Sequence, residues 1–209
     1  MRYGDIWKIA FSKRKEKKIV VVSVNTTFDT IVDENLAIVD KPLVSPSSMH
    51  GQWLTYMKSK NVDISTIDKN ITNSLQLQKI NPIRVLNSEI KKRGKLNCYA
   101  KGTIAVYEYE NTIFYLIALS EFDENNNAQN TKRELVSTIT ELIDFYDKHG
   151  NGYDIYVPLM GTLQSRTGIS RVNSLEILTS MFELYEDKIQ GCANIIVYFK
   201  DRDKVSLGM

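Results

Sequence analysis

The sequence predicts an α/β fold of three layers, in which helices flank a mixed, mostly parallel central sheet. Residues 18–24 read KIVVVSV, with apolar side chains on both faces of a strand, which is typical of the middle of a covered sheet. Strand and helix patterns alternate through the second half of the chain, as parallel strands require. A polar loop bounded by Gly161 and Gly168 joins one such strand to a helix. We therefore expect a single domain over residues 1–209.

The first 17 residues predict an amino-terminal strand followed by a basic segment. Trp7, Ile9 and Phe11 are spaced by two, which is the period of a strand. The cluster of lysine and arginine in residues 13–18 has two interpretations. We favour a solvated hairpin turn; the alternative is a segment just cytoplasmic of a removed membrane anchor.

The middle of the chain predicts two helices and a hairpin. Ser47 or Ser48 caps a helix that runs to about Lys58, because the apolar residues after the cap share one helical face. Residues 63–78 carry apolar side chains three and four apart and predict the second helix. Two β-rich runs in residues 102–120 flank a central turn and predict the hairpin.

The second half continues in the order helix, strand, helix, strand. Residues 131–149 form an amphipathic helix that ends at a glycine-rich turn. The apolar run 154–160 is a strand, and a helix is expected from about Ile169 to Ile189. Residues 193–199 give the last strand, which completes the sheet.

Composition narrows the class of protein. The chain has 209 residues, 43% hydrophobic and 25% charged, which is enough to build a sizeable core. Its net charge of +2 is too small to predict a nucleic-acid partner. It lacks an apolar run of about 18 residues and the pattern of a signal peptide, so we expect a cytoplasmic location. Cys98 and Cys192 are far apart and predict reduced thiols, and we expect no metal and no cofactor.

Three polar loops are expected at the carboxyl ends of the strands, where open α/β sheets bind ligands. They span residues 25–29, 45–51 and 161–168, and the last two lead into helices. Loop amides and helix N-termini attract anions, and two such helices suit a diphosphate. Loop hydroxyls and the charge of Arg166 or Arg171 would add to the site. The candidate ligand-binding residues are Asn25, Asp29, Ser47, Ser48, His50, Gly51, Gly161, Thr162, Leu163, Ser165, Arg166, Thr167 and Gly168.

Each of these residues also has a simpler interpretation. Asp29 can form a turn with its own backbone, His50 can pack or cap locally, and Arg166 can be an exposed loop charge. The prediction therefore rests on the combination of the three loops. The sequence near them has no carboxylate pair, activated nucleophile or metal cluster, so we predict no catalytic residue.

The element order and the loops resemble a macro domain, the fold that binds ADP-ribose. The closer resemblance is to the divergent macro domain of Thoeris antiphage defence effectors. It is carried by Val24-Asn25 with Phe28-Asp29-Thr30, by SPSSMHGQ at residues 45–52, and by VPLMGT at residues 157–162 with Ser165-Arg166. The resemblance covers roughly residues 18–199.

This resemblance implies a sensor that is not an enzyme. Its ligand would be an ADP-ribose-derived nucleotide signal, such as histidine-conjugated ADP-ribose, made by a partner TIR-domain enzyme. Binding would activate an effector, which is compatible with a homo-oligomer, tethered to the inner membrane through a segment absent from this chain. Typical macro domains carry an Asn-Ala-Ala-Asn motif and a glycine-rich first loop. Here residues 47–51 stand in for them, which favours binding over hydrolysis.

Two other functions stay open at this point. One is hydrolysis of ADP-ribosylated protein or of a small ADP-ribose conjugate, with Asn25, Asp29 or His50 activating a water. The other is nucleic-acid binding through the basic residues 91–95 and 13–18. These runs are short and lack interleaved aromatic residues, which disfavours the second function.

Overall fold

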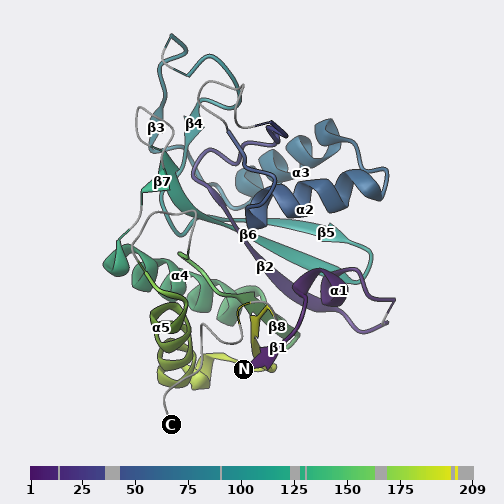
Figure 1. Cartoon of the computed structure of the whole chain (residues 1–209), viewed down its shortest axis with the longest axis vertical. Coiled ribbons are helices and arrows are strands. Elements are labelled where there is room, and N and C mark those ends of the chain that lie inside the picture. The colour runs from purple at the N-terminus through teal and green to yellow at the C-terminus, as the bar shows by residue number, and fades with distance from the viewer. Residues whose placement is uncertain are drawn as a thin grey trace.

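The computed structural model describes residues 1–13, 15–35, 43–89, 91–122, 128–129, 131–162, 169–198 and 201, and Figure 1 shows their arrangement. The strands are β1 (Arg2–Tyr3), β2 (Lys18–Asn25), β3 (Arg84–Val85), β4 (Asn97–Cys98), β5 (Ile104–Tyr109), β6 (Thr112–Phe122), β7 (Ala128–Gln129), β8 (Asp154–Pro158) and β9 (Ala193–Val197). The helices are α1 (Ile6–Ala10), α2 (Met49–Ser59), α3 (Ile64–Leu77), α4 (Lys132–His149), α5 (Arg171–Leu184) and the short 3₁₀ helix η1 (Glu186–Lys188).

Most strands of the described chain form one sheet in the order β1-β9-β8-β2-β6-β5, with β7 paired to β6. Neighbours from β1 through β6 along this order are parallel. The hairpin partner β5 runs antiparallel to β6. The predicted mixed, mostly parallel sheet is therefore confirmed, and its strongest strand, β2, lies between β8 and β6.

The sheet separates two hydrophobic clusters, and the alternating side chains of β2 contribute to both. Val20 and Val22 pack in the cluster that contains Trp53 of α2. Ile19 and Val21 pack in the cluster that contains Leu142 of α4. Figure 1 shows α2 and α3 on one side of the sheet and α4 and α5 on the other. These are the three predicted layers.

The sequence predicted the starts of α2 and α4 well, because the residues that cap each helix lie within a few positions of its first turn. The Ser48 side chain accepts a hydrogen bond from the amide of Gly51 at the start of α2. Thr131 and Glu134 form a capping box at the start of α4. The expected helix from Ile169 is shorter than predicted: it begins after the cap Ser170, ends at Leu184 and is followed by η1.

The strand predicted around Trp7, Ile9 and Phe11 was wrong. This segment contains α1, whose cap Asp5 accepts a hydrogen bond from the amide of Trp7 at 2.9 Å. Burial at helical spacing decides the conformation, since Ile6, Trp7 and Ala10 are all buried. The amino-terminal strand itself is reduced to the two residues of β1. The sequence analysis also did not predict the two-stranded sheet formed by β3 and β4.

Candidate functional site

Two of the three loops predicted to bind a ligand, residues 25–29 and 161–168, follow strands that run in the same direction. β2 is parallel to β6 and β8, and β8 is parallel to β9. The carboxyl ends of β2 at Asn25, of β8 at Pro158 and of β9 at Val197 therefore meet at one edge of the sheet, named here the carboxyl edge. Open α/β sheets bind ligands at this edge.

Two contacts bring the starts of α2 and α5 to the carboxyl edge. The hydroxyl of Tyr198, one residue beyond β9, donates to the sulfur of Met49 in the first turn of α2 at 3.7 Å. Nε of Arg171, the first residue of α5, lies 2.9 Å from Oδ1 of Asp201. Arg171, considered above as a charge for the ligand, thus already pairs with a protein carboxylate.

The start of α2 is held by the loop before it. The Ser48 hydroxyl donates to the carbonyl of Ser45 at 2.6 Å and accepts from the amide of Gly51 at 3.0 Å. A Cβ at Gly51 would collide with the carbonyl oxygen of Ser45, so this close approach requires glycine. Within the part of the chain that the structure describes, the amides of Met49 and His50 have no acceptor. They are the free donors of a helix start.

Ser47 is exposed, and its hydroxyl lies 3.0 Å from that of Ser45. Its carbonyl accepts a hydrogen bond from the side chain of Gln52 at 2.8 Å. Ser47, Ser48, His50 and Gly51 are thus brought together around the first turn of α2.

The loop after β8 is fixed at both of its ends. Thr162 and Ile169 form an isolated parallel bridge, and the carbonyl of Met160 accepts a hydrogen bond from the Ser174 hydroxyl at 2.7 Å. Gly161 has φ +72, a left-handed conformation that glycine adopts readily. Gly161 and Thr162 therefore lie at the carboxyl edge. The other predicted residues of this loop, Leu163, Ser165, Arg166, Thr167 and Gly168, lie outside the described residues.

Asp29 is fully buried at the end of β2, inside a network of donors. Its Oδ2 accepts from Asn25 Nδ2 at 3.2 Å, from the Thr27 hydroxyl at 2.6 Å and from Lys91 Nζ at 2.7 Å. Its Oδ1 accepts from the amide of Lys95 at 2.7 Å. A carboxylate offers about four acceptor positions, so these contacts occupy it. Asn25 and Asp29 thus shape the loop from within, and a direct contact to a ligand stays a prediction.

The basic run 91–95, considered above for nucleic acid, folds back on the protein. Three of its four cations pair with carboxylates: Lys91 with Asp29 at 2.7 Å, Arg93 with Asp33 at 2.5 Å, and Lys95 with Asp68 at 2.5 Å. The sequence of the basic run alone does not predict these three aspartate partners. The run therefore anchors its own segment against β2 and α3.

His50 is a second buried titratable group of this edge, beside Asp29, and only 4% of its surface is exposed. Burial lowers the pKa of His50 to about 3, while the negative charge of Asp29 raises it by a smaller amount. The imidazole is therefore neutral at physiological pH. Its Nε2 is buried and has no hydrogen-bond partner among the described residues. A buried polar atom without a partner is uncommon in folded proteins and asks for an explanation.

The described part of the chain holds no group of three or more His, Cys, Asp or Glu side chains that could bind a metal ion. Among the helices in the described ranges, none has the length and apolar character needed to cross a bilayer.

Comparisons with known proteins place the chain in a family. The family model described as "Thoeris protein ThsA, Macro domain" matches residues 1–200. The chain is also 25% identical to the Thoeris protein ThsA of Bacillus amyloliquefaciens (strain Y2) over 211 aligned residues. That alignment covers 99% of this chain and 64% of the relative, so the chain spans less than two thirds of the relative's length.

Among solved structures, the Trypanosoma brucei macrodomain in complex with ADP-ribose matches 91% of this chain and 62% of its own, with 8% identity and a TM-score of 0.41. The fold is that of an α/β domain with a mixed, mostly parallel sheet covered by helices on both faces. On the family match over residues 1–200, the chain belongs to the macro domain family of the Thoeris protein ThsA.

Proposed function

We propose that the carboxyl edge binds an ADP-ribose-type nucleotide, and that the domain acts as a sensor of this nucleotide. The observation that carries the proposal is the meeting of two helix starts, those of α2 and α5, at one edge. Helix starts stabilise negative charge through their free amides and their dipoles. Two of them at one edge of the sheet suit the diphosphate of ADP-ribose, with Gly161 and Thr162 forming one wall.

Neutral His50 supports the same proposal. Its imidazole lies in the first turn of α2, and its Nε2 lacks a partner among the described residues. A neutral imidazole can donate to, or accept from, a ribose hydroxyl or a base without adding charge. Membership in the macro domain family agrees with this class of ligand.

The finer part of the proposal concerns the signal and its source. We infer that the ligand is a nucleotide signal, such as histidine-conjugated ADP-ribose, made by a TIR-domain enzyme that acts with this protein in antiphage defence. The relative is named for the Thoeris system, which supports this inference. The domain would act in the cytoplasm, with a membrane tether outside residues 1–209.

Thermal unfolding in the presence of candidate ligands tests the proposal. A ligand at about 100 times its dissociation constant stabilises the folded state by about 2.7 kcal/mol. ADP-ribose, histidine-conjugated ADP-ribose and cyclic ADP-ribose isomers should be compared at millimolar concentration, with adenosine as a control that lacks the diphosphate. A midpoint increase with an ADP-ribose compound and none with adenosine is expected. No increase with any ADP-ribose compound would contradict the proposal.

Hydrolysis of an ADP-ribose conjugate is the second candidate. A general base must reach a water, yet Asp29 is fully buried and holds four donors, and His50 is 4% exposed. This arrangement favours binding over catalysis. Incubating each ligand with the protein for hours, followed by mass spectrometry, separates the two functions. Intact ligand supports a sensor, whereas cleavage that depends on the protein identifies an enzyme.

A sensor must couple its ligand to a second state, and a ligand shifts that equilibrium only through different affinities for the two states. We propose a change in self-association as the second state. Light scattering with and without ligand tests this mechanism. A changed molecular mass supports it, and an unchanged mass contradicts it.

A further inference from the structure

A side-chain amide near the start of α2 joins the candidate site to α1. Gln52 accepts a hydrogen bond at Oε1 from Nε1 of Trp7 at 2.8 Å, and its Nε2 donates to the carbonyl of Ser47 at 2.8 Å. An indole N–H can only donate and a peptide carbonyl can only accept, so each end of the amide is matched to its partner. A glutamate here would keep the acceptor for Trp7 and lose the donor to Ser47.

The contact with Ser47 helps to fix the peptide group that leads into α2. The N–H of this peptide, which belongs to Ser48, donates to the carbonyl of Ser45 at 3.0 Å, and its carbonyl accepts from Gln52. Both polar ends of the peptide are therefore held. The next two amides along the chain are the free donors of the first turn described above. A carbonyl oxygen that turned toward an anion at these donors would repel it, so holding this peptide favours anion binding.

Trp7 forms the other end of the link. It is buried, and its ring stacks on that of Tyr56 with centroids 5.5 Å apart. Gln52 and Tyr56 are four residues apart and share one face of α2. Trp7 therefore packs along this face, and the packing holds its indole N–H in place to donate to Gln52.

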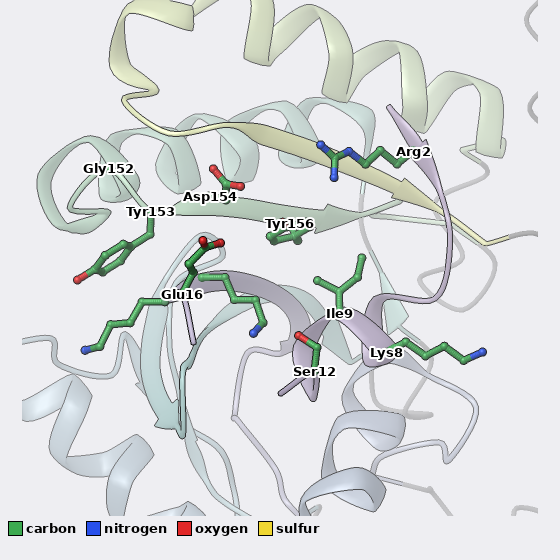
Figure 2. Close-up of a pocket in the computed structure, with 11 residues that line it drawn as sticks. Arg2, Lys8, Ile9, Ser12, Glu16, Gly152, Tyr153, Asp154 and Tyr156 are labelled. Carbon is green, nitrogen blue, oxygen red and sulfur yellow. The ribbon is translucent and has the colours of Figure 1, made fainter. Parts of the chain in front are cut away.

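Two neighbours of Trp7 in α1 line a cavity instead. Lys8 and Ile9 border a cavity of about 380 Å³, whose lining also includes Asp154 and Tyr156 of β8. Figure 2 shows Ile9 directed toward β8 and Lys8 extending away from the sheet. This side of α1 is incompletely packed, so the contacts that Trp7 makes with α2 contribute much of what holds the helix.

We propose that Gln52 is a positioning residue for the nucleotide and that it transmits the occupied state of the carboxyl edge to α1. It holds the peptide before α2, so that the free amides of the first turn face the diphosphate. A ligand that fixes this turn also fixes Gln52, and through it the indole of Trp7. The role rests on the proposed nucleotide site. Because linkage between two sites is reciprocal, loss of the contact between Trp7 and Gln52 must also weaken nucleotide binding.

Calorimetric titration with ADP-ribose tests the positioning role. Gln52 is half-buried, and Gln52→Met keeps an unbranched side chain of similar length while removing both hydrogen bonds. The variant should raise the dissociation constant about threefold to tenfold. Trp7→Phe keeps an aromatic ring against Tyr56 and removes the indole donor, so it should have a smaller effect in the same direction.

Gln78, at the end of α3, provides the matched control. It also donates to a backbone carbonyl, that of Ile104 at 3.0 Å, and its other partner is Ser74 rather than the loop 45–51. Gln78→Met should therefore retain wild-type affinity for ADP-ribose. Equal weakening by Gln52→Met and Gln78→Met would overturn the specific role of Gln52.

The NMR signal of the Trp7 indole N–H tests the transmission. The chain has two tryptophans, so the indole signal that is missing from Trp7→Phe identifies Trp7. Saturating ADP-ribose should shift this signal in the wild type and leave it in place in Gln52→Met. A role in stability alone would make the signal insensitive to the ligand in both proteins. Equal shifts in the two proteins would overturn transmission through Gln52.

The outcomes separate this inference from the proposed function. If the wild type does not bind ADP-ribose, the nucleotide site itself is contradicted, and the role of Gln52 falls with it. If the wild type binds and Gln52→Met binds with equal affinity, the positioning role alone is overturned. Trp7→Phe keeps the test valid if Gln52→Met does not fold, because unchanged affinity in that variant would overturn the link to α1.

Discussion

Nζ of Lys91 donates to Oδ2 of Asp29 at 2.7 Å across 62 positions of chain, and both side chains are largely removed from solvent. The pair holds the 91–95 segment against the end of β2. Removing one member of a buried ion pair leaves an uncompensated charge, which is far more costly than losing a surface pair.

Lys91→Met should therefore lower the free energy of unfolding by about 3 kcal/mol, at the lower end of the usual range because Asp29 keeps its other donors. Urea denaturation measures this change. Lys92 is the neighbouring exposed lysine, and Lys92→Met should change stability by less than about 0.5 kcal/mol. Equal stability of the two variants would show that the pair does not anchor the segment.

Gly94 depends on the same carboxylate. It has φ +78, and a Cβ there would collide with Oδ1 of Asp29. Gly94→Ala combines backbone strain with displacement of this oxygen, so a loss of about 2 kcal/mol or more is expected. Gly4, with nothing within 4 Å of its Cβ position, is the control, and Gly4→Ala should be nearly neutral. Urea denaturation compares both, and a neutral Gly94→Ala would rule out this close packing.

His50 should make stability depend on pH. Its pKa is lowered to about 3 in the folded protein, below the usual value of 6.5 in the unfolded chain. The unfolded chain therefore binds an extra proton in this window, so stability is present above about pH 6.5 and is lost as pH falls toward 3. Between about pH 6.5 and 5 the loss attributable to His50 is about 2 kcal/mol.

Urea denaturation at several pH values measures this loss. His50→Gln should remove it, whereas His149→Gln, which changes an exposed histidine, should retain it. Identical pH profiles for wild type and His50→Gln would contradict a neutral buried imidazole.

Substitutions in residues 163–168, which lie outside the described residues, test whether this loop contacts the ligand. Arg166→Ala and Ser165→Ala should each raise the dissociation constant for ADP-ribose, by about tenfold or more for the arginine, because a charge-assisted hydrogen bond to phosphate is lost. Arg133, exposed on α4, provides the matched control Arg133→Ala. Calorimetric titration measures all three. Equal affinities for Arg166→Ala and Arg133→Ala would exclude Arg166 from the site.

Features with a local or periodic cause could be predicted from the sequence. The two apolar faces of β2 and the caps Ser48 and Thr131 lie within a few residues of what they determine. The helix α1 could not be predicted, because five residues give little periodicity and Trp7 is held by Gln52, 45 positions away, at 2.8 Å.

The site followed the same rule. The loops at residues 25–29 and 161–168 follow the parallel strands β2 and β8, which brings them to one edge. The loop at residues 45–51 precedes α2 and reaches this edge through the contact of Met49 with Tyr198. The hydrogen bonds that Lys91 and Lys95 donate to the Asp29 carboxylate were not predicted. The sequence around a lysine does not indicate which distant carboxylate it contacts in the fold.

A crystal structure of the protein with ADP-ribose tests the central claim most directly. The account predicts the diphosphate at the carboxyl edge, within hydrogen-bond distance of the first-turn amides of α2 and near Gly161 and Thr162. ADP-ribose bound only elsewhere, or absent from crystals soaked at millimolar concentration, would contradict it.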